Sequence, residues 1–199
     1  MTLVVPTGNT YNKYESRNPI ERRLMAGFFA ALGGSLPSRP PTTVLEVGVG
    51  EGEISSWLRA RAADADIFGI DLPDPARPDD WRRRGIVGLY ADITELPFPA
   101  KSFDLILAIE VLEHVPDPEA AVTELARLSC GHLVLSVPRE PVWRMANMAR
   151  GKYLADLGNT PGHIQHWSRR AFVDLVGSRL DVVAVRTPFP LTMVSARAR

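Results

Sequence analysis

The chain has 199 residues, of which 23 are basic and 23 acidic, so its formal net charge is zero. This length suits one domain with a sizeable core, and the balanced charge argues against a nucleic-acid partner held by bulk electrostatics. The single cysteine, Cys130, excludes an intrachain disulfide. Because no signal core follows Met1 and no apolar run approaches the ~20 residues of a membrane span, we expect a cytoplasmic protein without a membrane span.

The first regular element predicted is a helix that begins at Asn18-Pro19. Proline is tolerated in the first turn of a helix, and the apolar residues that follow share one helical face. Gly33-Gly34 predicts the end of this helix. Residues 1–17, ahead of it, are polar and irregular.

Residues 44–54 join an apolar run of the β type to a run with helical spacing through alternating glycines. This pattern predicts a buried strand, a tight turn and a helix over roughly 51–63. The glycines permit positive φ and a close approach of a flat, nucleoside-like ligand. A dinucleotide fingerprint needs a third glycine where this chain has Glu53. With Glu46 and Glu51, the acidic groups at the turn favour a cationic ligand over a diphosphate.

Three further strands are predicted up to residue 109, at 66–71, 86–90 and 102–109. The last is continuously apolar, as a strand covered on both faces should be. Asp71 lies ~20 residues after the glycine turn, where a carboxylate typically binds the two hydroxyls of a ribose. The alternative is that Asp71 only caps the end of its strand.

The rest of the chain continues to alternate between helical and strand patterns. We expect helices at 117–128, from Pro141 and after Ser168, and strands at 131–138, 180–187 and 191–196. His132, at the start of its strand, is interpreted as structural. The last two strands, joined around Pro188, predict an antiparallel hairpin.

Two groups of motifs resemble a known family. Glu46-x-Gly48-x-Gly50-x-Gly52 resembles the first motif of class I SAM-dependent methyltransferases. Residues 92–115 resemble the quinone-biosynthesis-type (methyltransferase type 11) enzymes, through Leu96-Pro97-Phe98, Ser102-Phe103-Asp104 and Glu110-Val111-Leu112-Glu113-His114-Val115. The resemblance implies an α/β fold: a Rossmann-like, doubly wound, mostly parallel sheet with a C-terminal antiparallel hairpin. It also implies S-adenosyl-L-methionine as cofactor and a small-molecule methyl acceptor.

The resemblance also implies which residues bind the cofactor. Glu46 and the glycines would hold the methionine part, Asp71 the ribose, and Asp92 with Ile93 the adenine. The full expected set is Tyr14, Glu46, Gly48, Gly50, Gly52, Asp71, Leu72, Asp92, Ile93, Ile109 and Glu110. Residues 1–36 either fold over the cofactor mouth, as in many methyltransferases, or form a plain packing helix with a frayed lead-in.

The segment after the fourth strand carries the candidate catalytic residues. Enzymes that methylate nitrogen often have an Asn/Asp-Pro-Pro-aromatic motif where this chain has Ile109 to Leu112, so oxygen is the expected acceptor atom. His114 is either the general base for a hydroxyl or a structural histidine at a helix start. His163 and His166 either act as base or acceptor-binding groups, or bond the backbone of their own loop.

Residues 139–167 are the least standard part of the chain and are predicted to form a substrate lid. Their basic residues either bind an anionic or phosphorylated acceptor or belong to exposed surface. These residues are Arg139, Arg144, Arg150 and Lys152.

A divalent metal is an alternative that the motif leaves open. Glu110, Glu113 and His114 resemble the metal site of the quinone O-methyltransferases. Magnesium prefers oxygen ligands, which makes the histidine a less natural partner, and the same spacing recurs in metal-free relatives. We therefore expect no metal, with magnesium as the alternative.

The expected function is methyl transfer from SAM to a small-molecule acceptor, a phenol, quinol or sugar hydroxyl, by a monomer or homodimer. Two other classes stay open: a non-catalytic SAM-binding protein and a nucleotide-dependent oxidoreductase. The acceptor itself does not follow from the sequence.

Overall fold

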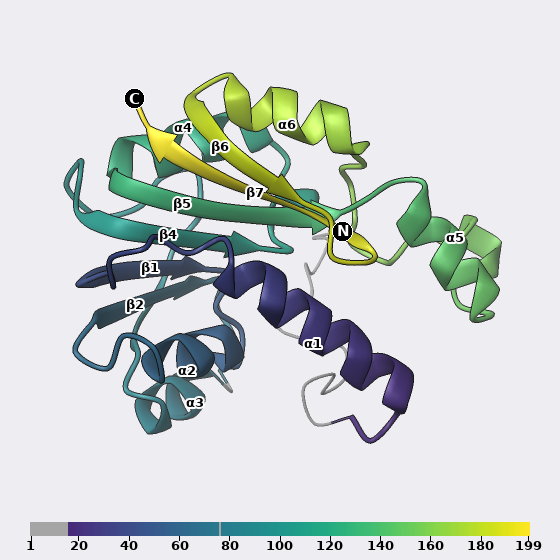
Figure 1. Cartoon of the computed structure of the whole chain (residues 1–199), viewed down its shortest axis with the longest axis horizontal. Helices are drawn as coiled ribbons and strands as arrows, with labels where there is room; N and C mark the ends of the chain where they lie inside the picture. Colours follow the sequence, from purple (N-terminus) through teal and green to yellow (C-terminus); the bar gives the residue numbers. More distant parts are fainter. Residues whose placement is uncertain (1–15, 76) are drawn as a thin grey trace.

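The structure, a computed structural model, describes residues 16–75 and 77–199. Its described part is built on one sheet with the strand order β3-β2-β1-β4-β5-β7-β6 (Figure 1). The strands are β1 (Thr43–Val47), β2 (Asp66–Asp71), β3 (Val87–Tyr90), β4 (Phe103–Ile109), β5 (Ser129–Pro138), β6 (Leu180–Arg186) and β7 (Leu191–Ala198). Neighbours pair in parallel from β3 to β5, whereas β7 pairs antiparallel with both β5 and β6. The predicted doubly wound sheet with a C-terminal antiparallel hairpin is confirmed.

Helices cover both faces of this sheet. They are α1 (Pro19–Gly33), α2 (Glu53–Arg59), α3 (Arg77–Arg83), α4 (Pro118–Leu128), α5 (Val142–Ala149) and α6 (Arg169–Gly177), with short 3-10 turns η1 (Leu112–His114) and η2 (Leu154–Asp156). α1 and α2 pack into one buried cluster, and α4 and α6 into a second cluster on the opposite face. β4 contributes to both, since Ile106 and Leu107 are each fully buried. Coverage of both faces explains the continuous apolar run seen in its sequence.

Side-chain caps set the helix starts that the sequence predicts. Asn18 accepts the N–H of Ile20 at 2.9 Å, and Ser168 accepts the N–H of Ala171 at 3.2 Å. α2 is shorter than the predicted 51–63 at both ends, since it ends at Arg59. Gly52 has φ +81°, and α2 cannot pass through that conformation. It therefore begins at Glu53.

The end of α1 is bound to the sheet. Ser35 follows this helix, and its carbonyl oxygen accepts a hydrogen bond from Nε2 of His132 at 2.8 Å. Burial lowers the pKa of His132, although this bond opposes the shift. The structural interpretation of His132 therefore agrees with its contacts.

The carboxyl ends of β1, β2, β4 and β5 lie at one edge of the sheet, because these strands are parallel. Figure 1 shows α5 projecting beyond this edge. Open parallel sheets bind their ligands beyond this edge, so the candidate functional site lies there. Among the helices of residues 16–75 and 77–199, none combines the length and the apolar content needed to cross a bilayer.

Candidate functional site

The glycine turn after β1 is held against the end of β2. Gly48, Gly50 and Gly52 have φ of +71°, +51° and +81°, which confirms the need for glycine there. The N–H groups of Gly48 and Val49 both donate to the carbonyl oxygen of Ile70, at 2.8 and 3.1 Å. The turn is therefore a fixed feature of the sheet edge.

Asp71, the last residue of β2, is bonded to this turn. One carboxylate oxygen accepts the N–H of Gly50 at 2.7 Å, and the other accepts the N–H of Leu72 at 2.8 Å. Burial raises the pKa of Asp71, and the two bonds oppose that shift. Each oxygen keeps a further lone pair for a ligand hydroxyl, so Asp71 acts as a strand-end cap and retains the capacity to bind a diol.

Trp81, on α3, is a component of the turn that the sequence reading missed. Its indole N–H donates to the carbonyl oxygen of Gly50 at 2.8 Å, and its side chain packs with Val49 and Ile86. A Cβ on Gly88 would lie 1.8 Å from the indole ring, so glycine at that position makes room for it. The only indication of this role in the sequence was one tryptophan among the charged residues of a short helix.

The carboxylates at the turn carry less net charge than the sequence suggests. Glu46 is 2% exposed, accepts a hydrogen bond from the hydroxyl of Ser55, and has its pKa raised by burial to about 8. Glu51 pairs with Arg77 at 3.3 Å, and Glu53 pairs with an arginine that follows α3. The electrostatic preference for a cationic ligand is therefore weaker than the count of carboxylates implies.

The backbone of the turn offers a second argument against a diphosphate. The N–H groups of Gly48, Val49, Gly50 and Gly52 all donate to acceptors within the protein. A pyrophosphate needs free N–H donors at such a turn. Hydrogen bonding therefore supports the exclusion that Glu53 indicated from the sequence.

The other expected cofactor residues lie at neighbouring strand ends. After β3, Asp92 accepts the N–H of Thr94 at 2.8 Å, while Ile93 is only 7% exposed and packs into the core. After β4, Glu110 has φ +56°, which is rare for a residue with a Cβ and marks a locally constrained backbone. Ile109, just before it, is 9% exposed. Tyr14 lies outside the described residues.

Two histidines from distant segments meet beside the end of β4. Nδ1 of His114 lies 2.9 Å from the carbonyl oxygen of Gly162, and the rings of His114 and His163 have centroids 4.9 Å apart. The indole of Trp143, on α5, stacks on His163 at 5.8 Å. The carbonyl oxygen of Glu113 accepts the backbone N–H groups of residues 164 and 165, which holds the loop on η1.

The environments of the two loop histidines differ. His163 is 9% exposed, and burial together with the nearby His114 lowers its pKa to about 4. His166 instead has Nε2 at 2.8 Å from the side-chain oxygen of Asn159, so it bonds its own loop. Of the two, His163 is the one in contact with His114.

Glu113, His114 and His163 have ligand atoms that all lie within 4.8 Å of one another. Glu110, the third member of the expected magnesium set, is not in this group. Two imidazoles and one carboxylate suit zinc or a similar ion better than magnesium. The residues present therefore do not fit magnesium well, and no chemical step is assigned to it.

The loop that carries His163 is fastened to α5. The indole N–H of Trp143 donates to the hydroxyl oxygen of Thr160 at 2.9 Å. The side-chain amide of Asn147, 2% exposed, donates to the carbonyl oxygen of Gly158 at 2.9 Å. α5 and this loop therefore form one bonded unit at the edge of the sheet.

The strand order, the glycine turn and the carboxylate that ends β2 define the fold of class I SAM-dependent methyltransferases, whose cofactor is S-adenosylmethionine. A family profile described as a methyltransferase domain matches residues 16–179, and the chain belongs to that family.

Individual relatives agree with this assignment. The chain is 35% identical over 104 residues to the 27-O-demethylrifamycin SV methyltransferase of Amycolatopsis mediterranei (strain S699), covering 49% of this chain and 38% of that protein. It is 35% identical over 98 residues to the ubiquinone biosynthesis O-methyltransferase of Nitrosomonas europaea (strain ATCC 19718), covering 43% of this chain and 38% of that protein. The chain thus matches well under half the length of either relative.

Among solved structures, a SAM-dependent methyltransferase from Aquifex aeolicus is similar, with a TM-score of 0.71 and 17% identity. The similarity covers 94% of this chain and 97% of that one. At this identity it supports the fold alone.

Proposed function

We propose that this protein transfers the methyl group of S-adenosylmethionine to a hydroxyl oxygen of a small molecule, such as a phenol, quinol or sugar. The observation that carries the proposal is the contact of His114 with His163 beside the end of β4. Both named relatives are methyltransferases of small molecules, and the name of one specifies oxygen as the acceptor atom.

The hydrogen bond of His114 assigns its tautomer. A carbonyl oxygen only accepts, so the bond to Gly162 places the proton of a neutral His114 on Nδ1. Nε2 then keeps its lone pair and serves as the general base for an acceptor hydroxyl. The loop carbonyl orients the ring, which makes the loop part of the catalytic geometry.

His163 contributes a neutral ring beside this base. Because its pKa is lowered to about 4, it carries no charge at neutral pH. It therefore neither repels the positive charge that His114 gains on taking a proton nor competes for that proton. Its face packs on Trp143, which gives the acceptor pocket an aromatic wall.

The cofactor residues follow from the same edge of the sheet. S-adenosylmethionine supplies an electrophilic methyl group on a sulfonium. Asp71 and Leu72 would hold its ribose, Asp92 its adenine, and the glycine turn its methionine part. Because methyl transfer is an in-line displacement, most of the catalysis comes from holding the hydroxyl near contact distance and in line with the sulfonium.

The lid completes the proposed pocket. Residues 139–167 contain α5 and the loop bonded to it, and they lie beyond the carboxyl edge of the sheet (Figure 1). Residues 1–36 would cover the cofactor from the other side. Enclosure by these two segments excludes water from the reacting methyl group.

The test measures cofactor binding and turnover separately. Calorimetric titration with S-adenosylhomocysteine reports binding, and formation of this product from S-adenosylmethionine reports turnover over a panel of phenols, quinols and sugars. His114→Gln is expected to lower kcat by about 10²- to 10⁴-fold, as loss of a general base does, with cofactor affinity unchanged.

His166→Gln is the matched comparison, because the structure gives His166 a bond within its loop. We expect it to change kcat much less than His114→Gln. An unchanged kcat in His114→Gln would remove the base assignment. Absence of cofactor binding at millimolar concentration would remove the function altogether.

A further inference from the structure

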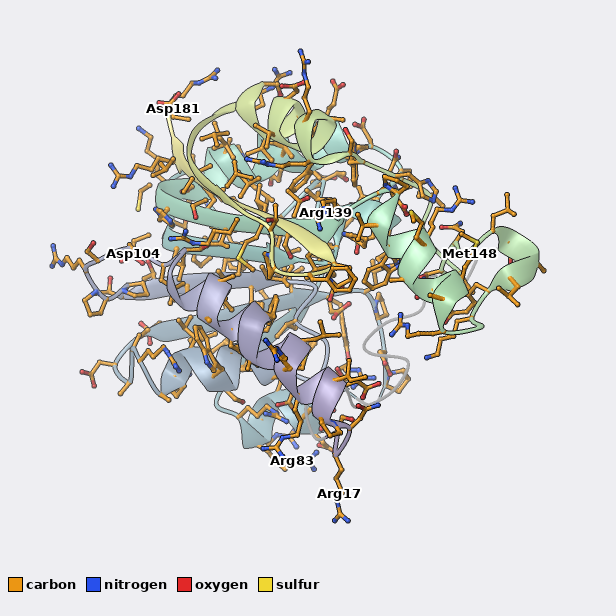
Figure 2. All side chains as sticks on the ribbon, turned by 45° about the vertical axis from the view of Figure 1, so that its right-hand side comes forward. Arg17, Arg83, Asp104, Arg139, Met148 and Asp181 are labelled. Carbon is orange, nitrogen blue, oxygen red and sulfur yellow. The ribbon has the colours of Figure 1, made fainter. Side chains whose placement is uncertain are left out.

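Arg139, directly after β5, has a backbone fixed by three segments. Its N–H donates to the carbonyl oxygen of Pro190 at 3.0 Å, and its carbonyl oxygen accepts the N–H of Trp143 at 2.9 Å. Its backbone also forms an isolated parallel β-bridge with Trp167. Figure 2 shows Arg139 between the end of the sheet and α5. The backbone position from which its side chain extends is therefore fixed.

The side chain of Arg139 is part-buried and has no hydrogen-bond or ion-pair partner in the described part of the chain. Its Nε is enclosed and makes no hydrogen bond, and the guanidinium forms no ion pair with any residue of 16–75 or 77–199. Glu140 is next in the chain, but its Oε2 is likewise enclosed without a hydrogen bond. An enclosed N–H donor without an acceptor is costly, so its retention calls for an explanation.

The other lid arginines are engaged within the lid. Arg144 donates to the carbonyl oxygen of Leu157 at 3.0 Å, and Arg150 donates to the side-chain oxygen of Asn147 at 2.6 Å. Arg144 therefore fastens α5 to its neighbouring loop, whereas Arg150 bonds within the end of α5. Arg139 differs from them because its guanidinium has no such acceptor among the residues that the structure describes.

The position of Arg139 at the end of β5 favours contact with the acceptor rather than with the cofactor. The proposed cofactor residues follow β1, β2, β3 and β4, whereas Arg139 follows β5, on the far side of β4 from β1. Its carbonyl oxygen holds the N–H of Trp143, which stacks on His163. The backbone of Arg139 is therefore bonded to a residue of the ring pair that forms the proposed acceptor wall.

We propose that Arg139 binds a carboxylate or phosphate group of the methyl acceptor, so that the acceptor is an anionic small molecule. A guanidinium presents a planar fork of N–H donors that matches both groups. The role of this anion as a methyl acceptor rests on the proposed function. The binding of an anion at Arg139 is a separate measurement, so either idea can fail alone.

The test observes the Nε–H of Arg139 directly by ¹H–¹⁵N correlation of the arginine side chains, with S-adenosylhomocysteine present. Benzoate, acetate and inorganic phosphate are titrated to about 20 mM, a range that detects millimolar binding. Benzamide and acetamide are the neutral matches. The Arg139 signal is assigned as the one missing in Arg139→Lys.

A saturable shift of this signal with one of the anions and none with the amides is expected, and phosphate against benzoate tells which anion fits better. Arg139→Gln should weaken the binding of that anion at least tenfold, while its melting temperature stays equal to wild type or rises, because an enclosed N–H donor without an acceptor is removed. Arg170→Gln, at a side chain that is 93% exposed, should leave binding unchanged.

Three results would overturn the proposal: no shift with any of the three anions, equal shifts with acids and amides, or a lower melting temperature of Arg139→Gln with unchanged anion binding. The last would make Arg139 a structural residue. If anions bind at Arg139 but no S-adenosylhomocysteine forms from any hydroxyl acceptor, the anion site stands and the methyl-transfer proposal fails.

Discussion

The carboxylate of Asp71 accepts the backbone N–H of Gly50 at 2.7 Å, and this bond joins the end of β2 to the turn that follows β1. The other side of Gly50, its carbonyl oxygen, accepts the indole N–H of Trp81 at 2.8 Å. Gly50 is thus held from both sides by groups that contribute nothing to the glycine motif itself. The shape of the turn depends on β2 and α3 as much as on its own glycines.

Asp71→Asn tests the carboxylate. An amide has only one acceptor oxygen, so it cannot accept from both Gly50 and Leu72, and its NH₂ group would face one of these N–H donors. The same amide can accept from only one ribose hydroxyl, and loss of one such hydrogen bond costs about 1–3 kcal/mol, which predicts about 10- to 100-fold weaker binding of S-adenosylhomocysteine in calorimetry. Asp66→Asn, at the exposed start of β2, should bind as wild type. Equal affinity in Asp71→Asn would contradict this role.

Trp81→Phe separates the support of the turn from its ligand contacts. Phenylalanine fills most of the space beside Val49 and Ile86 but has no N–H to donate to Gly50. Because one neutral hydrogen bond contributes about 0.5–1.5 kcal/mol, we expect the affinity for S-adenosylhomocysteine to fall a few-fold and the melting temperature by a few degrees. A variant with wild-type affinity would show that the turn keeps its shape without the indole.

Gly48→Ala should be far more damaging than its size suggests. Gly48 has φ +71°, and a Cβ there would lie 2.3 Å from a methyl group of Val111, on the segment that leads into η1. Gly151→Ala is the matched control, since Gly151 has φ +69° but nothing within 4 Å of a Cβ. Both variants carry the strain of positive φ, so the difference in their free energy of unfolding measures the clash alone. Similar losses in the two would mean that Val111 moves away freely.

The sequence predicted the sheet well because its strands carry their own local signals. β2 was placed at the residues that form it, and the helix starts at Asn18 and Ser168 follow from side-chain caps two or three residues away. The meeting of His114 with His163 had no such signal. These residues are 49 positions apart and come together through backbone bonds to Glu113. Contacts of that range depend on packing, which periodicity does not report.

The predicted charge at the turn illustrates the same limit. Glu46 is fully enclosed against Ser55, and Arg77 reaches Glu51 from α3. The sequence shows which carboxylates lie at the turn, whereas their protonation and ion pairing depend on neighbours that are remote in sequence. The predicted cofactor class was correct, although the charge at the turn favours a cation less than the number of carboxylates implies.

Glu46 predicts a specific dependence of stability on pH. Its pKa is raised from the ordinary 4.5 to about 8, so the folded protein holds a proton that the unfolded chain releases between these values. The free energy of unfolding therefore falls as pH rises from 4.5 to about 8, by up to about 1.4 kcal/mol per pH unit from this group. Glu46→Gln keeps the uncharged form and should lose this slope.

Urea denaturation at about pH 5.5, 7 and 8.5 measures the difference between Glu46→Gln and wild type. The variant should gain relative stability at each step upward in pH. Glu119→Gln, at an exposed position of α4, should shift stability by a similar amount at every pH. A constant difference for Glu46→Gln as well would mean that Glu46 is ionised in the folded protein.

Asn147 links the lid helix to the loop that positions the histidines. Its buried side-chain amide donates to the carbonyl oxygen of Gly158 at 2.9 Å and to the hydroxyl of Thr160 at 3.2 Å. Asn147→Ala removes both bonds, together with the one that its side-chain oxygen accepts from Arg150, and leaves the Gly158 acceptor unpaired, at a cost of about 1–3 kcal/mol. Because only the lid depends on these bonds, hydrogen exchange should quicken in residues 158–167 by about 10- to 100-fold while β4 and β5 stay protected.

The same variant also tests whether the lid acts in turnover. Under the proposed function, loosening this loop frees the carbonyl of Gly162 that orients His114, so kcat should fall while affinity for S-adenosylhomocysteine stays unchanged. Met145→Ala is the control on the same helix, at a side chain that is 60% exposed, and it should alter neither exchange nor kcat. Faster exchange with an unchanged kcat would show that His114 is positioned without the loop.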